Sequence, residues 1–588
     1  MPMINLKSLC SLRILHLEYC FSYGNINEVI KRLPRCSPNK LQELHLQSNN
    51  LTGYLPSVMG YLTSIVILDL SWNNITGLLQ TFIGKFSSLQ TLDLTGNNFT
   101  GGVPYEIGVL TNLTNLYLGN NAFNIVIKQK HFGGLKSLKY LELAYTSLKI
   151  EVRPEWQPPF RLYYADFATC HLGPLFPAWL CWMADIDFLD ISGTGIKDKI
   201  PHWFSDAFSN SVYLNLARNE ITGYLPRNME IKPLQRLYLN SNNLTGPIPL
   251  LPPNVTYLDI SLNSLCLFSN RITGAVPEYI CKCKELTVLD LANNLFEGPL
   301  PPCSGLTKLM TVELSNNSLS GEFPSFLQNS TNLQFLDLAW NKFTGRLPPW
   351  IGNLVGLQFL RLKHNMFSGN IPMTITNLGC LQYLDVAENG IYGKYYSNEN
   401  EPFSNQMSIR VLVCPDTKGQ ELNYGSSSHF LDKNVMSIDI SSNNLSGKIP
   451  EEIVTLDALV NLNLSRNHFS RTVPDDIGVM KSLQSLDLSR NRLSGGIPAS
   501  MSDMTFLSYL DLSYNNLTGI IPPGSQLDSI YASNPYMYAG NIGLCGPPLI
   551  KNCSSSNVSL QSDFKGSEGG PEFFYLGLGC GFIVGIWM

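Results

Sequence analysis

The sequence is poor in charge, and this limits what the protein can bind. Only 14% of its residues are charged, the formal net charge is −5, and no run of basic residues occurs. Nucleic-acid binding requires positive charge clustered on one surface, so this composition excludes it as a main function.

Enzyme motifs and metal-site spacings are absent as well. The sequence has no G-x-x-x-x-G-K-[ST], H-E-x-x-H or G-x-S-x-G motif, and its eight histidines are scattered. Cys281, Cys283 and Cys303 do not have the spacing of a metal site, so they either bridge adjacent coils or stay reduced. We therefore expect no enzyme activity, no cofactor and no metal.

The N-terminus lacks the basic and apolar regions of a secretory signal, because Leu12, Leu15 and Leu17 already follow a repeat pattern. At the other end, the uncharged run from Phe573 to Met588 would span roughly 24 Å as a helix. A full membrane span needs about 20 residues. We expect a partial transmembrane helix in a chain truncated at both ends.

What the chain does have is a repeat of about 24 residues, L-x-x-L-x-L-x-x-N-x-L-x-G-x-[IVL]-P. It reads LQELHLQSNNLTGYLP from Leu41, LQTLDLTGNNFTGGVP from Leu89, LQFLDLAWNKFTGRLP from Leu333 and LSYLDLSYNNLTGIIP from Leu507. This period predicts an α/β-type leucine-rich-repeat solenoid of roughly 21 coils, a superhelix with a concave parallel β-sheet.

Each L-x-L segment is expected to form a short strand whose leucines point into the core. The asparagine three places later should turn inward and hydrogen-bond backbone groups of neighbouring coils. These asparagines are Asn49, Asn73, Asn97, Asn242, Asn270, Asn317, Asn341, Asn365, Asn443, Asn467, Asn491 and Asn515.

Breaks in the period define the expected domain organisation. It comprises an irregular first repeat (1–40), repeats (41–389), a non-repeat island (390–434), repeats (435–528), a C-terminal cap (529–556), a linker (557–572) and the partial transmembrane helix (573–588). Long insertions in a compact array are usually functional or disordered. In the cap, Cys545 and Cys553 are the best disulfide candidates.

Two irregularities occur within the repeats. Between residues 138 and 201 the asparagine position holds Thr146, Cys170 and Thr194, which predicts a bend or bulge. Between Leu258 and Leu289 the chain is too short for two coils, so either Leu258 or Leu265 cannot lie in a regular strand.

Sequons for N-glycosylation are frequent and indicate an exported chain, although the repeat itself generates several of them. They begin at Asn50, Asn74, Asn98, Asn112, Asn243, Asn254, Asn316, Asn329, Asn444, Asn463, Asn516, Asn552 and Asn557.

Function in a solenoid is expected on the concave surface. Aromatic and arginine side chains are enriched at binding hot spots, and several occupy outward-facing positions there. The ligand-binding candidates are Arg236, Tyr238, Asp337, Trp340, Arg361, Lys363 and His364.

Four features together resemble the plant leucine-rich-repeat receptor-like proteins: the L-x-G-x-[IVL]-P half repeat, the island, the GNIGLCGPPL cap and the apolar run with Gly577, Gly581 and Gly585. The stretch VRPEWQPPFRL is similar to grass members related to fungal-resistance receptors. The island residues that carry the resemblance include Lys418, Gly419, Gln420, Glu421 and Tyr424.

The resemblance implies a single-pass plasma-membrane receptor with extracellular repeats and no kinase, acting in defence or development. It would bind a peptide or protein ligand, and would recruit an adaptor receptor kinase through the glycine-spaced helix, where small residues allow close approach. A somatic-embryogenesis-type co-receptor kinase would bind the coils after the island. The alternatives are a secreted inhibitor of pathogen cell-wall hydrolases and a non-functional remnant.

Overall fold

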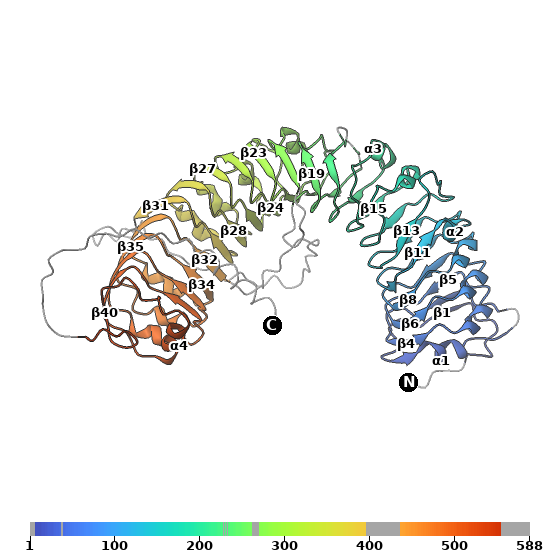
Figure 1. The fold of residues 1–588 in the computed structure, drawn as a ribbon, viewed down its shortest axis with the longest axis horizontal. Coiled ribbons are helices and arrows are strands. Elements are labelled where there is room, and N and C mark those ends of the chain that lie inside the picture. The colour runs from blue at the N-terminus through green and yellow to red at the C-terminus, as the bar shows by residue number, and fades with distance from the viewer. Residues whose placement is uncertain are drawn as a thin grey trace.

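The computed structural model describes residues 6–36, 39–226, 229, 231, 233–261, 270–394 and 436–553. The chain forms an arch of stacked coils with the N-terminal coils at one foot and the C-terminal coils at the other (Figure 1). This is the leucine-rich-repeat solenoid that the period predicts.

One parallel sheet of 20 strands follows the arch, with one strand from each coil and a coil's strand paired to the next. Its strands lie along the inner, concave side (Figure 1). In order they are β1 (Ile14–His16), β3 (Glu43–His45), β5 (Ile67–Asp69), β7 (Thr91–Asp93), β9 (Asn115–Tyr117), β12 (Tyr140–Glu142), β14 (Tyr164–Asp166), β15 (Phe188–Asp190), β16 (Tyr213–Asn215), β18 (Arg236–Tyr238), β20 (Tyr257–Asp259), β22 (Val288–Asp290), β24 (Thr311–Glu313), β26 (Phe335–Asp337), β28 (Phe359–Arg361), β30 (Tyr383–Asp385), β32 (Met436–Asp439), β34 (Leu459–Asn463), β36 (Ser485–Asp487) and β38 (Tyr509–Asp511).

A second layer of parallel strands forms where each coil leaves the concave sheet, and it is divided into three sheets of 5, 2 and 13 strands. The first contains β2 (Gly24–Asn25), β4 (Leu51–Tyr54), β6 (Asn74–Leu78), β8 (Asn98–Gly101) and β10 (Ala122–Phe123), and the second contains β11 (Val126–Lys128) and β13 (Lys149–Glu151). The third contains β17 (Thr222–Tyr224), β19 (Asn243–Gly246), β21 (Arg271–Gly274), β23 (Leu295–Pro299), β25 (Ser318–Gly321), β27 (Lys342–Arg346), β29 (Met366–Gly369), β31 (Gly390–Lys394), β33 (Asn444–Gly447), β35 (His468–Arg471), β37 (Arg492–Gly495), β39 (Asn516–Ile520) and β40 (Gly543–Cys545).

Short helices complete the coils. The α-helices are α1 (Ile26–Lys31), α2 (Gln129–Phe132), α3 (Phe204–Ala207) and α4 (Ser525–Ser533). The 3₁₀-helices, several of which follow the proline that ends the repeat, are η1 (Ser57–Tyr61), η2 (Thr81–Lys85), η3 (Tyr105–Val109), η4 (Ala178–Trp182), η5 (Glu278–Lys282), η6 (Ser325–Asn329), η7 (Pro349–Asn353), η8 (Met373–Asn377), η9 (Glu451–Thr455), η10 (Ile477–Val479) and η11 (Ala499–Asp503).

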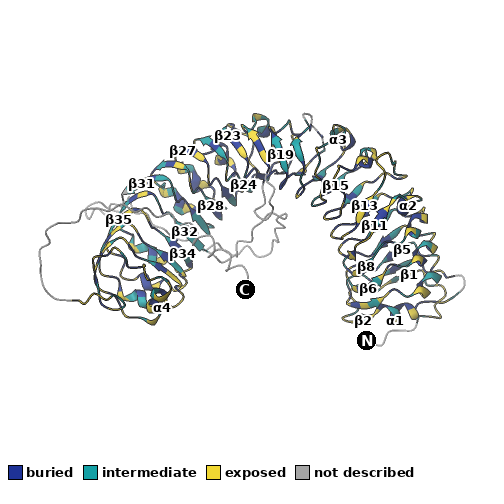
Figure 2. Ribbon diagram, viewed as in Figure 1, coloured by how far each residue is buried: buried dark blue, intermediate teal, exposed yellow. Residues whose placement is uncertain are grey.

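The core is one continuous column of leucine, isoleucine and phenylalanine side chains that runs between the layers, and Figure 2 shows its buried residues along the whole arch. The middle residue of each concave strand points into it, as Leu68 and Leu336 do. The inward asparagines satisfy the backbone beside this column. Asn97 donates from Nδ2 to the carbonyl oxygens of Leu70 (2.9 Å) and Leu94 (3.1 Å), and its Oδ1 accepts from the N–H of Ile75 (3.0 Å).

The irregular stretch interrupts the second layer and leaves the concave sheet intact. The break falls between β10 and β17, where β11 and β13 form a separate two-stranded sheet. Here Thr146 and Thr194 replace the asparagine and donate to carbonyl oxygens of their own coils, at 2.7 and 2.8 Å. A hydroxyl has one hydrogen, whereas an asparagine amide has two and a separate acceptor oxygen, so a threonine satisfies fewer backbone groups than asparagine does.

The shortened coil keeps Leu258 in register, because β20 pairs with β22 and Leu258 lies opposite Leu289. Leu265 lies outside the described residues. At the island, β30 pairs directly with β32, and a register shift occurs between Met436 and Ser437 where β32 meets β34.

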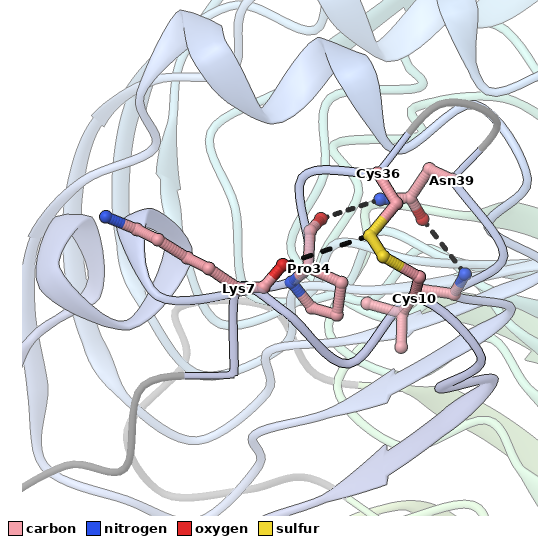
Figure 3. The surroundings of a disulfide bond; sticks show 6 residues. Lys7, Cys10, Pro34, Cys36 and Asn39 are labelled. Atoms are coloured by element: carbon pink, nitrogen blue, oxygen red, sulfur yellow. Dashed lines mark hydrogen bonds between the residues drawn. A yellow bond between two sulfur atoms is a disulfide. The ribbon is translucent and has the colours of Figure 1, made fainter.

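The described residues contain three disulfides, one in the first coil, one between coils in the middle of the array and one near the last coil. Cys10 is joined to Cys36 in the first coil, where Asn39 donates to the carbonyl oxygen of Pro34 at 2.9 Å (Figure 3). The other two bonds join Cys281 to Cys303, across adjacent coils, and Cys545 to Cys553.

No helix in the described part of the chain is both long enough and apolar enough to cross a membrane. The expected span 573–588 and the linker residues from 557 lie outside that part.

Candidate ligand-binding surface

Two columns of side chains follow the concave sheet because its strands are in register. The last residue of each strand lies beside the last residue of its neighbours, and the residue two places earlier forms a second column. Both columns flank the buried leucine, so they lie on the concave face of the sheet and point away from the core, although several of the carboxyl groups are covered by neighbouring side chains.

The earlier position is rich in aromatic residues, which we call the aromatic column: Tyr164, Phe188, Tyr213, Tyr257, Phe335, Phe359 and Tyr383. The rings stack nearly parallel in two groups of three, one around Phe188 and one around Phe359. The ring centroid of Phe188 lies 4.4 Å from that of Tyr164 and 4.2 Å from that of Tyr213, and both pairs have an interplanar angle of 11°. The ring centroid of Phe359 lies 4.1 Å from that of Phe335 and 4.4 Å from that of Tyr383. Each inner ring is covered on its faces, so the column offers ring edges to a ligand.

The last position is rich in carboxylates, which we call the acidic column: Asp166, Asp190, Asp259, Asp290, Glu313, Asp337 and Asp385. The aspartates also have a structural role. Oδ1 of Asp166 accepts from the N–H of Ala168 at 3.0 Å, and Oδ1 of Asp337 accepts from the N–H of Ala339 at 2.9 Å. This bond closes the turn that follows the strand.

Burial changes the protonation of the acidic column. It raises the pKa of Asp166 to about 7, with the nearby carboxyl of Asp190 adding to the effect. It raises the pKa of Glu313 to about 8 and that of Asp385 to about 6, and it raises the pKa of Asp290 well above its ordinary value. Several carboxyls are therefore partly protonated near neutral pH, and a cation placed beside them would displace those protons.

Arg361 occupies the acidic column between two aspartates. Its Nη1 lies 3.3 Å from Oδ2 of Asp337, and its Nε lies 3.6 Å from Oδ2 of Asp385. Burial raises the pKa of Asp337 even though Arg361 opposes the effect. Arg361 is thus the counter-ion of two buried carboxyl groups and has a role in folding stability.

Next to this pair, four side chains form a second cluster. The ring of His364 stacks on that of Trp340 with centroids 4.0 Å apart, and its Nδ1 lies 2.8 Å from Oε2 of Glu388. Lys363 Nζ lies 3.1 Å from Oε1 of Glu388. Burial raises the pKa of Glu388, but the hydrogen bonds from His364 and Lys363 outweigh burial and lower it overall.

The structure brings together five of the seven expected ligand-binding residues. Asp337, Trp340, Arg361, Lys363 and His364 come from β26, β28 and the turns that follow them. Arg236 and Tyr238 lie on β18, four strands away from β26. Asp337 lies on the concave face, but its side chain is only 8% exposed and is paired with Arg361.

The sequence analysis did not identify the aromatic column. Its signal is present, because the residue two places before the aspartate of L-D-[LIV] is aromatic in several repeats, as in FLDI and YLDV. Reading one repeat at a time hides the signal, since the rings meet only when coils stack.

The other expected sites fall into two groups. Asn50, Asn74, Asn98, Asn112, Asn254, Asn316, Asn329, Asn444, Asn516 and Asn552 are exposed, while Asn243 and Asn463 are partly buried. The island residues Lys418, Gly419, Gln420, Glu421 and Tyr424, the glycines Gly577, Gly581 and Gly585, and Asn557 lie outside the described residues.

Profiles of the leucine-rich repeat match much of the array. One matches residues 39–99 and 472–520. Another matches 233–255, 308–330, 332–354, 356–378, 434–456 and 458–480.

Plant receptor-like proteins are among the similar sequences. Receptor-like protein EIX2 of Solanum lycopersicum is 36% identical over 180 residues, which are 30% of this chain and 17% of that protein. Receptor-like protein 54 of Arabidopsis thaliana is 33% identical over 171 residues, 28% of this chain and 20% of that protein. The matched segments thus span a fifth or less of these two relatives.

Solved receptor ectodomains share the fold over most of the chain. The Arabidopsis receptor kinase HAESA, solved with the peptide hormone IDA and the co-receptor SERK1, is 27% identical with a TM-score of 0.69, covering 92% of this chain and 83% of that one. A TDR receptor is 26% identical with a TM-score of 0.65, covering 90% and 93% of the two chains.

Proposed function

We propose that this chain, which belongs with the plant leucine-rich-repeat receptor-like proteins, binds an extracellular peptide or protein on its concave surface and signals through partner receptor kinases. The observation that carries the proposal is the continuous concave sheet with its aromatic and acidic columns. The mechanism is non-covalent recognition.

The chemistry of the two columns defines the ligand class. The stacked rings form an apolar ridge, and the adjacent carboxyl groups favour cationic side chains. The two columns run side by side along the same face. An extended peptide that lies along them, with successive side chains directed to either side of its axis, would place apolar residues over the rings and basic residues over the carboxyl groups. Arg361, Lys363 and His364 are already paired with acidic side chains. In ligand binding they would orient the ligand through hydrogen bonds more than they would attract negative charge.

The likeness to HAESA supports a role for partners. In that structure a peptide hormone and the co-receptor SERK1 are bound to a solenoid of this fold. By analogy, a co-receptor kinase of that kind would bind the coils from β32 to β38 together with the island. An adaptor receptor kinase would bind the apolar segment 573–588.

Two features support an extracellular location at the plasma membrane. Ten sequon asparagines are exposed on the described coils, so glycosylation would not disturb the core. The three disulfides suit an oxidising compartment. A role in defence is implied by the resemblance of the VRPEWQPPFRL stretch to grass members related to fungal-resistance receptors, and it is part of this proposal.

The test is to capture ligands from plant apoplastic fluid on the immobilised chain and to identify the retained peptides by mass spectrometry. A variant with Phe188→Ala and Tyr213→Ala removes the centre of the aromatic column. We expect this variant to lose the retained peptides, and we expect those peptides to be enriched in lysine and arginine. Addition of the wild-type ligand fraction should then promote association with the SERK1 ectodomain in gel filtration.

The matched control is Tyr224→Ala, since Tyr224 is an exposed tyrosine on the second layer. Its peptide profile should equal that of the wild type, and circular dichroism checks the fold of all variants. If the wild type and the double variant retain the same peptides, the proposal that the ligand binds on the concave surface is wrong.

A further inference from the structure

At the N-terminal end of the concave sheet, two histidines take the position that aspartate holds in most coils. β1 and β3 pair in register, and His16 lies opposite His45. Their rings stack with centroids 4.0 Å apart and an interplanar angle of 21°. Two imidazoles are thus fixed side by side by backbone pairing.

A carboxylate completes a set of three donors. Oε1 of Glu18 lies 3.3 Å from Nδ1 of His16. One donor atom from each of His16, Glu18 and His45 lies within 4.8 Å of the other two. Two ligands of a tetrahedral zinc ion, with bonds of about 2.0–2.2 Å, are about 3.4 Å apart. The donors are therefore already close to the spacing of a metal's ligand shell.

A second carboxylate orients one of the rings. Oε2 of Glu43 lies within hydrogen-bond distance of Nε2 of His45, at 3.4 Å, and 4.0 Å from Nε2 of His16. When Nε2 of His45 carries the proton and donates to Glu43, Nδ1 of His45 keeps a lone pair for a metal. Metal-binding histidines usually donate their other N–H to a carboxylate in this way.

The site is open to ions from solvent. The side chains of His16 and Glu18 are 52% and 37% exposed, while that of His45 is 15% exposed. Within the described part of the chain, this is the one group of three His, Cys, Asp or Glu side chains whose donors come this close.

We propose that His16, Glu18 and His45 form a binding site for a divalent transition-metal ion, Zn²⁺ or Cu²⁺, with Glu43 as the residue that positions the imidazole of His45. Two nitrogen donors and one carboxylate favour these ions over Mg²⁺ and Ca²⁺, which prefer an all-oxygen shell. Solvent fills the remaining coordination position. The site is independent of what the acidic and aromatic columns bind.

The test is isothermal titration of the purified chain, without a polyhistidine tag, with Zn²⁺ and separately with Mg²⁺. We expect one equivalent of Zn²⁺ to bind and Mg²⁺ not to compete. His16→Ala and His45→Ala should each weaken Zn²⁺ binding at least about tenfold, and Glu43→Gln should weaken it about tenfold or more. Binding should weaken as the pH falls, because only neutral imidazole is a ligand.

The matched control is His364→Ala, which removes an exposed histidine that faces one carboxylate and an aromatic ring but no second imidazole. It should leave Zn²⁺ binding unchanged. Cys20→Ser removes the exposed thiol nearest in sequence, and it too should leave binding unchanged.

Cobalt gives an independent readout, since Co²⁺ bound by two nitrogens and a carboxylate has visible absorption bands that His45→Ala should abolish. The proposal is overturned if the chain takes up no Zn²⁺, if the variant with both histidines replaced still binds one equivalent, or if Cys20→Ser abolishes binding. Thermal melts without metal check that each variant folds.

Discussion

At the scale of single residues, the last strand position combines a structural bond with an adjustable charge. An aspartate there accepts from the N–H two residues later, and an asparagine can do the same. Asn215 and Asn463 occupy this position and accept from the N–H groups of Ala217 (3.0 Å) and Ser465 (3.1 Å). The negative charge is therefore not needed to close the turn. The effect of the charge on folding stability can be measured separately by replacing aspartate with asparagine.

We predict that Asp166→Asn stabilises the protein at alkaline pH. Burial raises the pKa of Asp166 to about 7 from an ordinary value of 3.8, so the folded chain binds this proton more tightly than the unfolded chain. The contribution of Asp166 to wild-type stability is then fully present below its ordinary pKa and is lost as the pH rises through about 7. The variant should gain about 2–4 kcal/mol at pH 8 and less at pH 5, measured by urea unfolding. An equal effect at both pH values would contradict this.

We predict that Arg361→Met destabilises the chain by about 2–3 kcal/mol at pH 8, because it leaves two buried carboxyl groups without a counter-ion. The loss should be smaller at pH 5, where Asp385, whose pKa is raised to about 6, is mostly protonated. Urea unfolding at the two pH values measures it. Lys363→Met is the control, since its partner Glu388 is more exposed and the pair contributes at most about 1 kcal/mol. Equal losses in both variants would show that burial of the aspartates is not the cause.

At the scale of elements, neighbouring coils approach one another closely where their 3₁₀-helices pack together. The glycine of η7, Gly352, faces the backbone of Thr374 in η8, and a Cβ there would lie well inside 3.0 Å of the Thr374 carbonyl oxygen. Gly108 and Gly478 make the same approach in other coils. These glycines therefore set the distance between coils on the convex side.

We predict that Gly352→Ala lowers the free energy of unfolding by about 1–3 kcal/mol, since the added methyl group overlaps rigid backbone. Gly356→Ala is the matched control, because its nearest atoms would be 3.7 and 3.8 Å away. That change should be neutral or slightly stabilising. Thermal and urea unfolding of both variants provide the comparison, and similar stability of the two would exclude close packing at Gly352.

The sequence predicted the features that recur in every coil, including the asparagine bonds between neighbouring coils, and missed the features that depend on which particular side chains meet across coils. Leucine spacing identified the concave strands, and the inward asparagines form the hydrogen bonds expected of them, as Asn97 does. The second layer, the ring stacking of Phe188 and the burial of Asp337 depend on register between coils. No property of a single repeat carries that register, so periodicity alone could not reveal them.

At the scale of the whole molecule, stability depends on contacts between adjacent coils, because each coil contacts mainly its two neighbours. Disulfides add covalent links within the first described coil, Cys10–Cys36, and beside β40, Cys545–Cys553. The first of these was missed in the sequence, where only the second pair was recognised from its cap motif.

We predict that replacing Cys10 and Cys36 together by serine loosens only the first coils. A disulfide that closes a loop of 26 residues stabilises by about 3–4 kcal/mol. Hydrogen exchange should accelerate in β1 and β3 and remain unchanged in β26 and β28, because stability in such arrays is local. A uniform acceleration along the chain would show instead that the solenoid unfolds as one cooperative unit.

The direct pairing of β30 with β32 has an evolutionary consequence. The residues between them add dozens of positions to the chain, yet the only change in register is the shift between Met436 and Ser437. At β20 and β22 the chain is shorter than two coils, and the pairing is equally regular. Duplication, loss or exchange of the DNA that encodes segments between strands would thus alter the length of the protein while the pairing of the concave strands stays the same. Recognition surfaces can therefore diversify without a new fold.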